Sequence, residues 1–277
     1  MRIGQNPNKQ APASVFPAQL ATVTTHLPKA VGYHEWRLGI VQASLITMRR
    51  YSGVPVMVWD NGSCDELRAW LINDYKPDYL ILSPNVGKQS ARRAMAGMLP
   101  PETIVGFTDD DMLFYPGWWS ASLDLLTGYP NVGAVSAWAN RVSFDWGAKS
   151  TLDWAAKSGA KVERGHFIPT AHEADYATSV GLAVGEHLSR VATRRDIRIT
   201  YNGLTAYAQA QHCQFICYAN RILPHCDYTE NAMGGERIFD DKIDAAGLLR
   251  LTTTERLARH MGNVIDDKLE AELETLL

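Results

Sequence analysis

Short apolar segments alternate with longer segments of helical spacing through the first half of the chain. The short segments are rich in β-branched residues and end at Pro, Gly, Asn or Asp, which is typical of strands. They predict five strands, at 20–25, 54–59, 79–82, 104–107 and 132–136. The intervening segment 34–50 carries apolar residues at helical spacing, and further helices are predicted after Ser63 and after Lys88.

The second half is less regular. We interpret the region from Asn140 to Arg198 as an insertion of helices and loops. Strand character returns at 207–218, followed by a predicted helix at 238–248, an extended segment at 249–251 and a final helix. The apolar stripe of that final helix is typical of a core or a subunit contact, and it makes a homo-oligomer possible. Alternating strands and helices favour an α/β fold with a mostly parallel central sheet flanked by helices.

Composition narrows the class of protein. A chain of 277 residues can bury one large core or two modest ones, and its net charge of −3 comes without a basic stripe, so no nucleic-acid partner is expected. No apolar run is long enough to span a bilayer, so we expect no transmembrane segment. Residues 1–10 lack an apolar signal core, which predicts a flexible arm and a cytoplasmic location.

The cysteines raise the question of a structural zinc site. Cys213 and Cys217 lie near His212, His225 and Cys226 in sequence. The alternation of apolar and polar positions along 211–217 is instead typical of one strand face, where free Cys packs as a small hydrophobic residue. We favour that second interpretation, and four cysteines without a disulfide-like framework agree with a reducing compartment.

The acidic triplet Asp109-Asp110-Asp111 is the strongest chemical signal in the chain. Three adjacent carboxylates repel one another, and a divalent cation relieves that repulsion. Asp109 and Asp111 are spaced to reach one Mn²⁺ or Mg²⁺ ion, whose open positions suit diphosphate oxygens. An acidic turn is the alternative, but the triplet follows a predicted buried strand, and ligands of open α/β sheets bind beyond the carboxyl ends of strands.

Several segments together resemble the family 2 glycosyltransferases, which have the GT-A fold. The segments are Val58-Trp59-Asp60-Asn61-Gly62-Ser63, Asn85-Val86-Gly87-Lys88, Thr108-Asp109-Asp110-Asp111, Gly234-Gly235-Glu236 ahead of Gly247, and Arg259-His260-Met261-Gly262-Asn263. Each is short, but their order and spacing agree with the family from about Ala21 to Asn263.

The resemblance implies a GT-A-type, Rossmann-like fold in one domain over 1–277. Residues 18–138 would form the nucleotide-sugar-binding half, 139–263 a smaller acceptor-side half, and 264–277 a C-terminal helix. It implies transfer of a sugar, of the hexosyltransferase type, from a nucleotide-diphosphate sugar to the hydroxyl of a sugar or other small acceptor. The metal ligands would be Asp109, Asp111 and His260. The implied nucleotide-sugar contacts are Thr24, Thr25, His26, Asp60, Asn85, Lys88, Arg92 and Asp110.

Three of these residues have specific roles under the resemblance. Asp60 would accept an N–H of the base, and Lys88 or Arg92 would offset phosphate charge or contact the ribose. For Arg92 and Arg93 an exposed helix face is the equally weighted alternative.

One departure concerns the catalytic base. The family usually has an acidic pair where this chain has Glu236-Arg237. A carboxylate within hydrogen-bond reach of the acceptor hydroxyl is a suitable base. Glu236 is therefore the first candidate and Asp240, four residues on and on the same helix face, the second. Direct attack would invert the anomeric carbon.

The acceptor side is less defined. His212 and Gln214 are expected to share a strand face and to look into the cleft, whereas Trp118, Trp119 and Trp138 are expected mostly to fill the core.

Three other functions are weighed against sugar transfer. A nucleotidyltransferase or sugar-nucleotide pyrophosphorylase would have a glycine- and lysine-rich loop after the first strand, and residues 26–32 match that poorly. A phosphohydrolase would carry its aspartates after the first strand rather than the fourth. A non-catalytic sugar-nucleotide-binding protein stays open because of Arg237.

Overall fold

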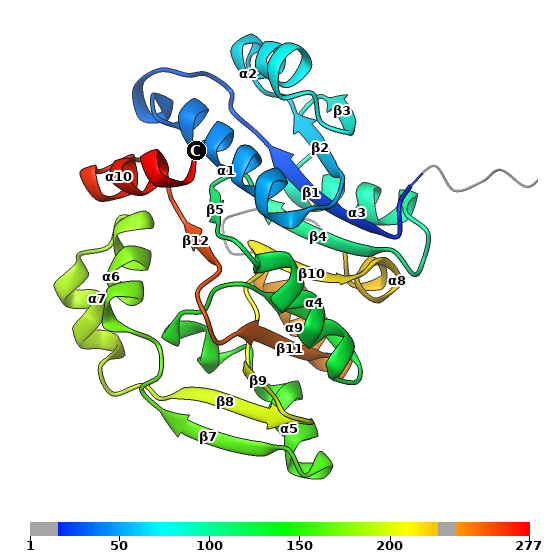
Figure 1. Ribbon diagram of the computed structural model, residues 1–277, viewed down its shortest axis with the longest axis vertical. Helices are drawn as coiled ribbons and strands as arrows, with labels where there is room; N and C mark the ends of the chain where they lie inside the picture. The colour runs from blue at the N-terminus through cyan, green and yellow to red at the C-terminus, as the bar shows by residue number, and fades with distance from the viewer. Residues whose placement is uncertain (1–15, 227–235) are drawn as a thin grey trace, which may run out of the picture.

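The structure, a computed structural model, describes residues 16–226 and 236–277. Its centre is a ten-stranded sheet with the order β3-β2-β1-β4-β10-β6-β11-β9-β8-β7 (Figure 1). The strands are β1 (Gln19–Thr25), β2 (Val56–Asn61), β3 (Tyr79–Ser83), β4 (Ile104–Asp109), β6 (Val132–Ser136), β7 (Lys161–Gly165), β8 (Asp196–Tyr201), β9 (Leu204–Tyr207), β10 (Gln214–Tyr218) and β11 (Leu249–Thr253).

Most of the strands share one direction. Parallel pairing joins β3, β2, β1 and β4, and also β6 and β11, whereas β10 is antiparallel to both β4 and β6. Further along the sheet, β9 and β7 also run against their neighbours. The predicted α/β fold with a mostly parallel central sheet is therefore confirmed.

The parallel half brings strand ends to one edge. In the register, Thr25 pairs with Asp60 and Thr24 pairs with Asp109. The loops after β1, β2, β3 and β4 consequently leave the sheet side by side, which is where ligands of open α/β sheets bind.

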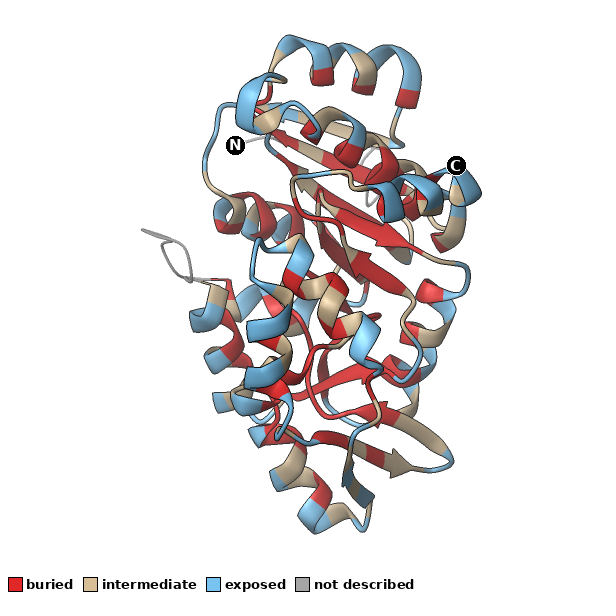
Figure 2. Cartoon of the chain, turned by 90° about the vertical axis from the view of Figure 1, so that its left-hand side faces the viewer, coloured by how far each residue is buried: buried red, intermediate tan, exposed pale blue. Residues whose placement is uncertain are grey.

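Helices cover both faces of the sheet (Figure 1). Helices α1 (Arg37–Ser52) and α4 (Trp118–Gly128) lie on one face, while α3 (Lys88–Met98), α8 (Ala219–Ile222) and α9 (Glu236–Ala245) lie on the other. The remaining α-helices of the described residues are α2 (Asp65–Trp70), α5 (Lys149–Ser158), α6 (Thr170–Ser179), α7 (Val184–Val191) and α10 (Asp267–Leu276), and four short 3-10 or π helices lie between the other elements. The strands between the layers are largely buried and the outer helix faces are exposed (Figure 2).

In the C-terminal half of the chain, the structure differs from the elements predicted from the sequence. Region 140–198 is not only helices and loops, because it contains β7 and the start of β8. The predicted strand at 207–218 is two strands, the end of β9 and β10, separated by a turn. A two-stranded sheet joins β5 (Met112–Phe114) to β12 (Ala258–His260), in antiparallel register with His260 opposite Met112. This small sheet places His260 beside the acidic triplet.

The C-terminal helix packs on its own chain. Leu269 and Leu273 of α10 are buried in one apolar cluster with Ile40, Ala43 and Leu113. The predicted apolar stripe is therefore a core contact, and a subunit contact through it stays a prediction. Among the described residues, no helix is long and apolar enough to cross a membrane.

Candidate active site

A cavity of about 330 Å³ lies at the strand-end edge. Seven residues predicted from the sequence line it together: Thr24, His26, Asn85, Lys88, Asp109, Asp110 and Asp111. Asn61 and Gly87 complete the lining. These residues come from the ends of β1, β2 and β4, from the loops after β1, β3 and β4, and from the start of α3, so the parallel register is what assembles the cavity.

One wall of the cavity is a set of hydrogen-bonded polar side chains. The Nδ1 of His26 lies 2.9 Å from the Asn61 carbonyl, and the Nδ2 of Asn61 donates to Asn85 Oδ1 at 3.0 Å. Asn85 Oδ1 also accepts from the Gly87 N–H at 3.0 Å. These bonds fix side chains that are suited to contact a polar ligand.

Asp109 is held by cations. Its Oδ2 accepts from Lys88 Nζ at 3.1 Å, and its Oδ1 lies 3.8 Å from Arg92 Nη2. Burial opposes ionisation of Asp109, but Lys88 and Arg92 outweigh burial and lower the pKa of the carboxyl. Asp109 is consequently a carboxylate at neutral pH.

Asp110 turns toward Arg37, a residue that the sequence analysis did not identify. Arg37 Nη2 donates to Asp110 Oδ1 at 2.5 Å, and the His26 N–H donates to Asp110 Oδ2 at 3.1 Å. Burial raises the pKa of Asp110 despite the opposing Arg37 charge. The second Arg37 nitrogen, Nη1, lies 3.5 Å from Asp111 Oδ2, so Arg37 offsets the charge of both carboxylates.

Asp111 and His260 come together as predicted. His260 Nε2 lies 3.4 Å from Asp111 Oδ2, and His260 Nδ1 lies 2.9 Å from Ser179 Oγ. If Nδ1 donates to Ser179, Nε2 presents a lone pair toward Asp111, the arrangement that a metal-ligating histidine needs.

The triplet fits a divalent cation, but no complete protein cage is present. Asp109 Oδ1 and Asp111 Oδ1 are both buried without a hydrogen-bond partner, which is costly unless a cation or donor satisfies them. Within 16–226 and 236–277, no group of three or more His, Cys, Asp or Glu side chains is arranged to hold a metal. Mg²⁺-type sites commonly use one or two carboxylates and complete their shell with water and substrate phosphates, so Asp111 and His260 would supply the protein ligands of such a site.

Glu236 begins α9 and faces the same cations. Its Oε1 forms an ion pair with Lys88 Nζ, and its Oε2 lies 3.7 Å from His212 Nε2. Gly234 and Gly235, the other residues of the predicted catalytic segment, lie outside the described residues. Arg237 turns away and lies over the Trp146 ring at 5.4 Å from its centroid.

Asp240 is poorly placed to be a base. It is 2% exposed, and its two oxygens contact Arg250 Nη2 at 2.8 Å and His212 Nδ1 at 3.1 Å. Since both oxygens are engaged below the surface, the structure favours Glu236 over Asp240 as the carboxylate that an acceptor can reach.

Three predicted nucleotide contacts do not line the cavity. Asp60 is fully buried, and its carboxylate accepts from Arg68 Nε at 2.7 Å and from the Ser63 N–H at 3.2 Å. Thr25 is also fully buried, and its hydroxyl donates to Asp60 Oδ1 at 3.4 Å. Arg92 is 2% exposed, so an exposed helix face is wrong for this residue, and its predicted contact with the nucleotide sugar stays a prediction. Its guanidinium lies 5.3 Å from the Phe215 centroid and donates to the His212 carbonyl at 3.1 Å.

Three site residues were not identified as such from the sequence: Arg37, Asn61 and Ser179. Asn61 lies inside the Val58–Ser63 segment, which was the available signal. Arg37 and Ser179 carry no motif, and only tertiary packing brings them to Asp110 and His260.

The acceptor-side expectations are met in part. Trp118, Trp119 and Trp138 are 5% exposed or less and fill the core as expected. His212 reaches the site, but Gln214 is fully buried, and its Oε1 accepts from the Ala137 N–H at 2.7 Å.

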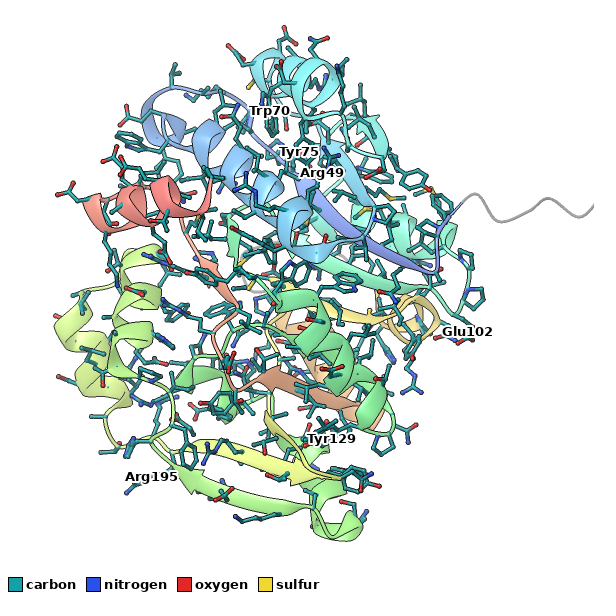
Figure 3. The ribbon with its side chains drawn as sticks, in the orientation of Figure 1. Arg49, Trp70, Tyr75, Glu102, Tyr129 and Arg195 are labelled. Carbon is teal, nitrogen blue, oxygen red and sulfur yellow. The ribbon has the colours of Figure 1, made fainter. Side chains whose placement is uncertain are left out.

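Another cavity, of about 450 Å³, lies beside Arg49, Trp70 and Tyr75, which group together between α1 and α2 (Figure 3). It shares no lining residue with the strand-end cavity.

Comparison with known proteins gives only weak similarities. No protein-family profile and no curated protein matches the chain. Among solved structures, a mannosyltransferase from Pyrobaculum calidifontis in complex with GDP-Man and Mn²⁺ is 22% identical over 53% of this chain, with a TM-score of 0.35. The chain spans less than half of that protein, 44% of its length.

Two further structures cover more of the chain. A 4-diphosphocytidyl-2C-methyl-D-erythritol synthase is 8% identical over 95% of this chain and 99% of its own, with a TM-score of 0.42. The galactosyltransferase LgtC in complex with donor and acceptor sugar analogs is 12% identical over 82% of this chain and 70% of its own, with a TM-score of 0.33. At these identities and TM-scores the similarities carry no argument about activity, so any function rests on the site.

Proposed function

We propose that this chain is a metal-dependent glycosyltransferase of the GT-A type, which moves a sugar from a nucleotide-diphosphate sugar to an acceptor hydroxyl. One observation carries the proposal: Asp109 and Asp111 each have a buried oxygen without a hydrogen-bond partner at a polar strand-end cavity, and Lys88, which pairs with Asp109, also pairs with Glu236 of α9. The candidate cation site and the candidate base are therefore close to each other, an arrangement that suits displacement of a diphosphate from a sugar carbon.

Different residues of the cavity would bind different parts of the nucleotide sugar. His26, Asn61 and Asn85 offer hydrogen bonds to the nucleoside, and Lys88 at the start of α3 offers a positive charge to the diphosphate, together with the helix N-terminus. Asp111 and His260 would hold a Mn²⁺ or Mg²⁺ ion, which supplies Lewis-acid stabilisation of the leaving diphosphate.

Glu236 accepts the proton of the acceptor hydroxyl. The Lys88 ammonium stabilises its carboxylate form, which is the form that takes a proton. As the hydroxyl oxygen attacks the anomeric carbon, the bond to the diphosphate breaks on the opposite side, so the configuration inverts. The nucleoside diphosphate is the expected product, whereas a nucleotidyltransferase would release or consume pyrophosphate.

The test is ligand-induced thermal stabilisation. UDP-glucose, UDP-galactose, UDP-N-acetylglucosamine and GDP-mannose are each added with Mn²⁺ and with chelator. A donor at one hundred times its Kd stabilises by about 2.7 kcal/mol, which raises Tm by roughly 5 °C for a chain of this size. We expect this with at least one donor, only with Mn²⁺.

Asp111→Ala should remove that metal-dependent stabilisation. The matched control is Asp124→Ala, because Asp124 is an exposed carboxylate on α4. A donor shift that persists in chelator and in Asp111→Ala, or the absence of any shift in wild type, would contradict the proposal.

A further inference from the structure

His212 lies between two carboxylates of α9. Its Nδ1 is 3.1 Å from Asp240 Oδ2, and its Nε2 is 3.7 Å from Glu236 Oε2. The His212 side chain is 31% exposed, whereas that of Asp240 is 3% exposed. One ring nitrogen therefore faces the interior, and the other faces the candidate base.

Asp240 is itself fixed. Its Oδ1 lies 2.8 Å from Arg250 Nη2, and the Arg250 side chain is 1% exposed. A carboxylate accepts hydrogen bonds, so Asp240 holds His212 in the tautomer that carries its proton on Nδ1. The backbone of His212 is also held, since its carbonyl accepts from Arg92 Nη2 at 3.1 Å. The ring consequently presents the lone pair of Nε2 to Glu236.

Glu236 has a different partner on each oxygen. Lys88 takes Oε1, and the imidazole faces Oε2. Two acceptor groups, a carboxylate oxygen and an imidazole lone pair, gain nothing from this approach while neither carries a proton. The approach becomes favourable when one proton is shared between them.

We propose that His212, a positioning residue that acts through Glu236, receives the acceptor's proton from that carboxylate. The inference rests on the proposed function. The acceptor O–H bond breaks, and its proton passes to Glu236 Oε2 and on to His212 Nε2. The electron pair of that bond stays on the attacking oxygen, and the leaving diphosphate takes the pair of the broken glycosidic bond. The resulting imidazolium is stabilised by Asp240. A shift of Glu236 by about 0.5–1 Å closes the gap to a hydrogen bond.

The experiment measures turnover with water as the acceptor, since the natural acceptor is not needed. The donor is the nucleotide sugar that raises Tm in the thermal-shift test. Its Mn²⁺-dependent hydrolysis is followed in wild type, His212→Gln, His212→Ala and Asp240→Asn. Gln keeps a polar group at this place but cannot take a proton. We expect kcat to fall about 100-fold in His212→Gln, the lower range for proton-transfer groups, while donor affinity changes less than twofold.

Two further results are expected. Added imidazole restores part of the kcat of His212→Ala, because it supplies the missing nitrogen. Asp240→Asn lowers kcat as well, since an amide no longer selects the tautomer. His166→Ala is the matched control, because His166 is exposed in the loop after β7, and it should leave kcat unchanged.

The outcomes separate the two proposals. A wild-type kcat in His212→Gln, or a loss that lies entirely in donor affinity, overturns the role of His212 and leaves the glycosyltransferase in place. Absence of any hydrolysis or transfer in wild type overturns both.

Discussion

At the scale of single residues, Gly262 lies against Ser179, the residue that hydrogen-bonds His260. It has φ of +78°, and a Cβ at this position would lie 2.1 Å from the Ser179 carbonyl oxygen. The loop after β12 therefore passes directly against the end of α6. The hydroxyl of the same Ser179 bonds His260 Nδ1. A side chain at position 262 would push away the residue that orients the histidine.

Gly262→Ala should therefore affect both stability and the metal site. Left-handed backbone strain and the overlap with Ser179 together cost at least about 2 kcal/mol. We expect a lower Tm and a smaller Mn²⁺-dependent donor shift in thermal-shift measurements. Gly185→Ala is the control, because Gly185 lies in α7 with open space around it, and alanine there should be neutral or stabilising. Equal effects of the two substitutions would contradict this role of Gly262.

The site residues predicted from the sequence come from the short segments that resemble the family. Asp111 and His260 are far apart in sequence, the resemblance placed them in one site, and their side chains lie 3.4 Å apart, whereas their role as metal ligands stays a prediction. The resemblance did not identify Arg37, which pairs with Asp110 and Asp111, because one arginine at the start of a helix has no distinctive pattern. For Arg92, the alternative of an exposed helix face is wrong because tertiary packing buries its side chain.

At the scale of elements, Asp175 joins three segments. It lies on α6, accepts from Arg256 Nη1 at 2.7 Å ahead of β12, and forms an ion pair with Lys268 of α10. Burial opposes its ionisation, but the hydrogen bonds from Arg256 and Lys268 outweigh burial and lower the pKa of Asp175. The native state thus favours the ionised form more than the unfolded chain does.

The unfolding free energy should therefore fall when Asp175 is protonated at low pH. A depressed native pKa stabilises the fold above the unfolded value of about 3.9, and that stabilisation is lost as pH falls through the native pKa. Asp175→Asn should cost about 1–3 kcal/mol at pH 7 by loss of charged hydrogen bonds. The difference in unfolding free energy between wild type and Asp175→Asn should narrow below about pH 4.

Denaturant unfolding at several pH values checks this. The control is Asp153→Asn, which removes an exposed ion pair with Lys149 and should leave the unfolding free energy at pH 7 almost unchanged. A difference between wild type and Asp175→Asn that stays constant from pH 7 to below 4 would argue against the ionic role of Asp175.

Local pattern was sufficient for some elements only. The strands β1 to β4 are bounded by turn residues and alternate with helices, so periodicity alone located them. The three-residue strands β5 and β12 pair across most of the C-terminal half of the chain, and neither is long enough to show a period of its own. Such short strands form only by pairing with each other, and the local sequence of one strand carries no information about the other.

At the scale of the whole molecule, the antiparallel strand β10 brings the segment that contains His212 next to the acidic triplet at the end of β4. Strand β10 lies between β4 and β6, and the Asp109 N–H donates to the Cys213 carbonyl at 2.7 Å. His212 is thereby brought next to the strand that ends in the acidic triplet. The sequence predicted the strand character of this segment but not its neighbours, because sheet order depends on packing among distant parts of the chain.

The C-terminal helix gives the last prediction. Leu269 is 1% exposed and packs with Ile40 and Ala43 of α1, and Arg50 of α1 donates to the Leu277 carbonyl at 2.9 Å. The buried part of the stripe thus packs against α1 of its own chain. Leu269→Ala should lower the unfolding free energy by about 2–5 kcal/mol without changing the mass measured by light scattering. Glu274→Ala, on the exposed side of α10, should change neither. A change in mass with unchanged stability would instead assign the stripe to a subunit contact.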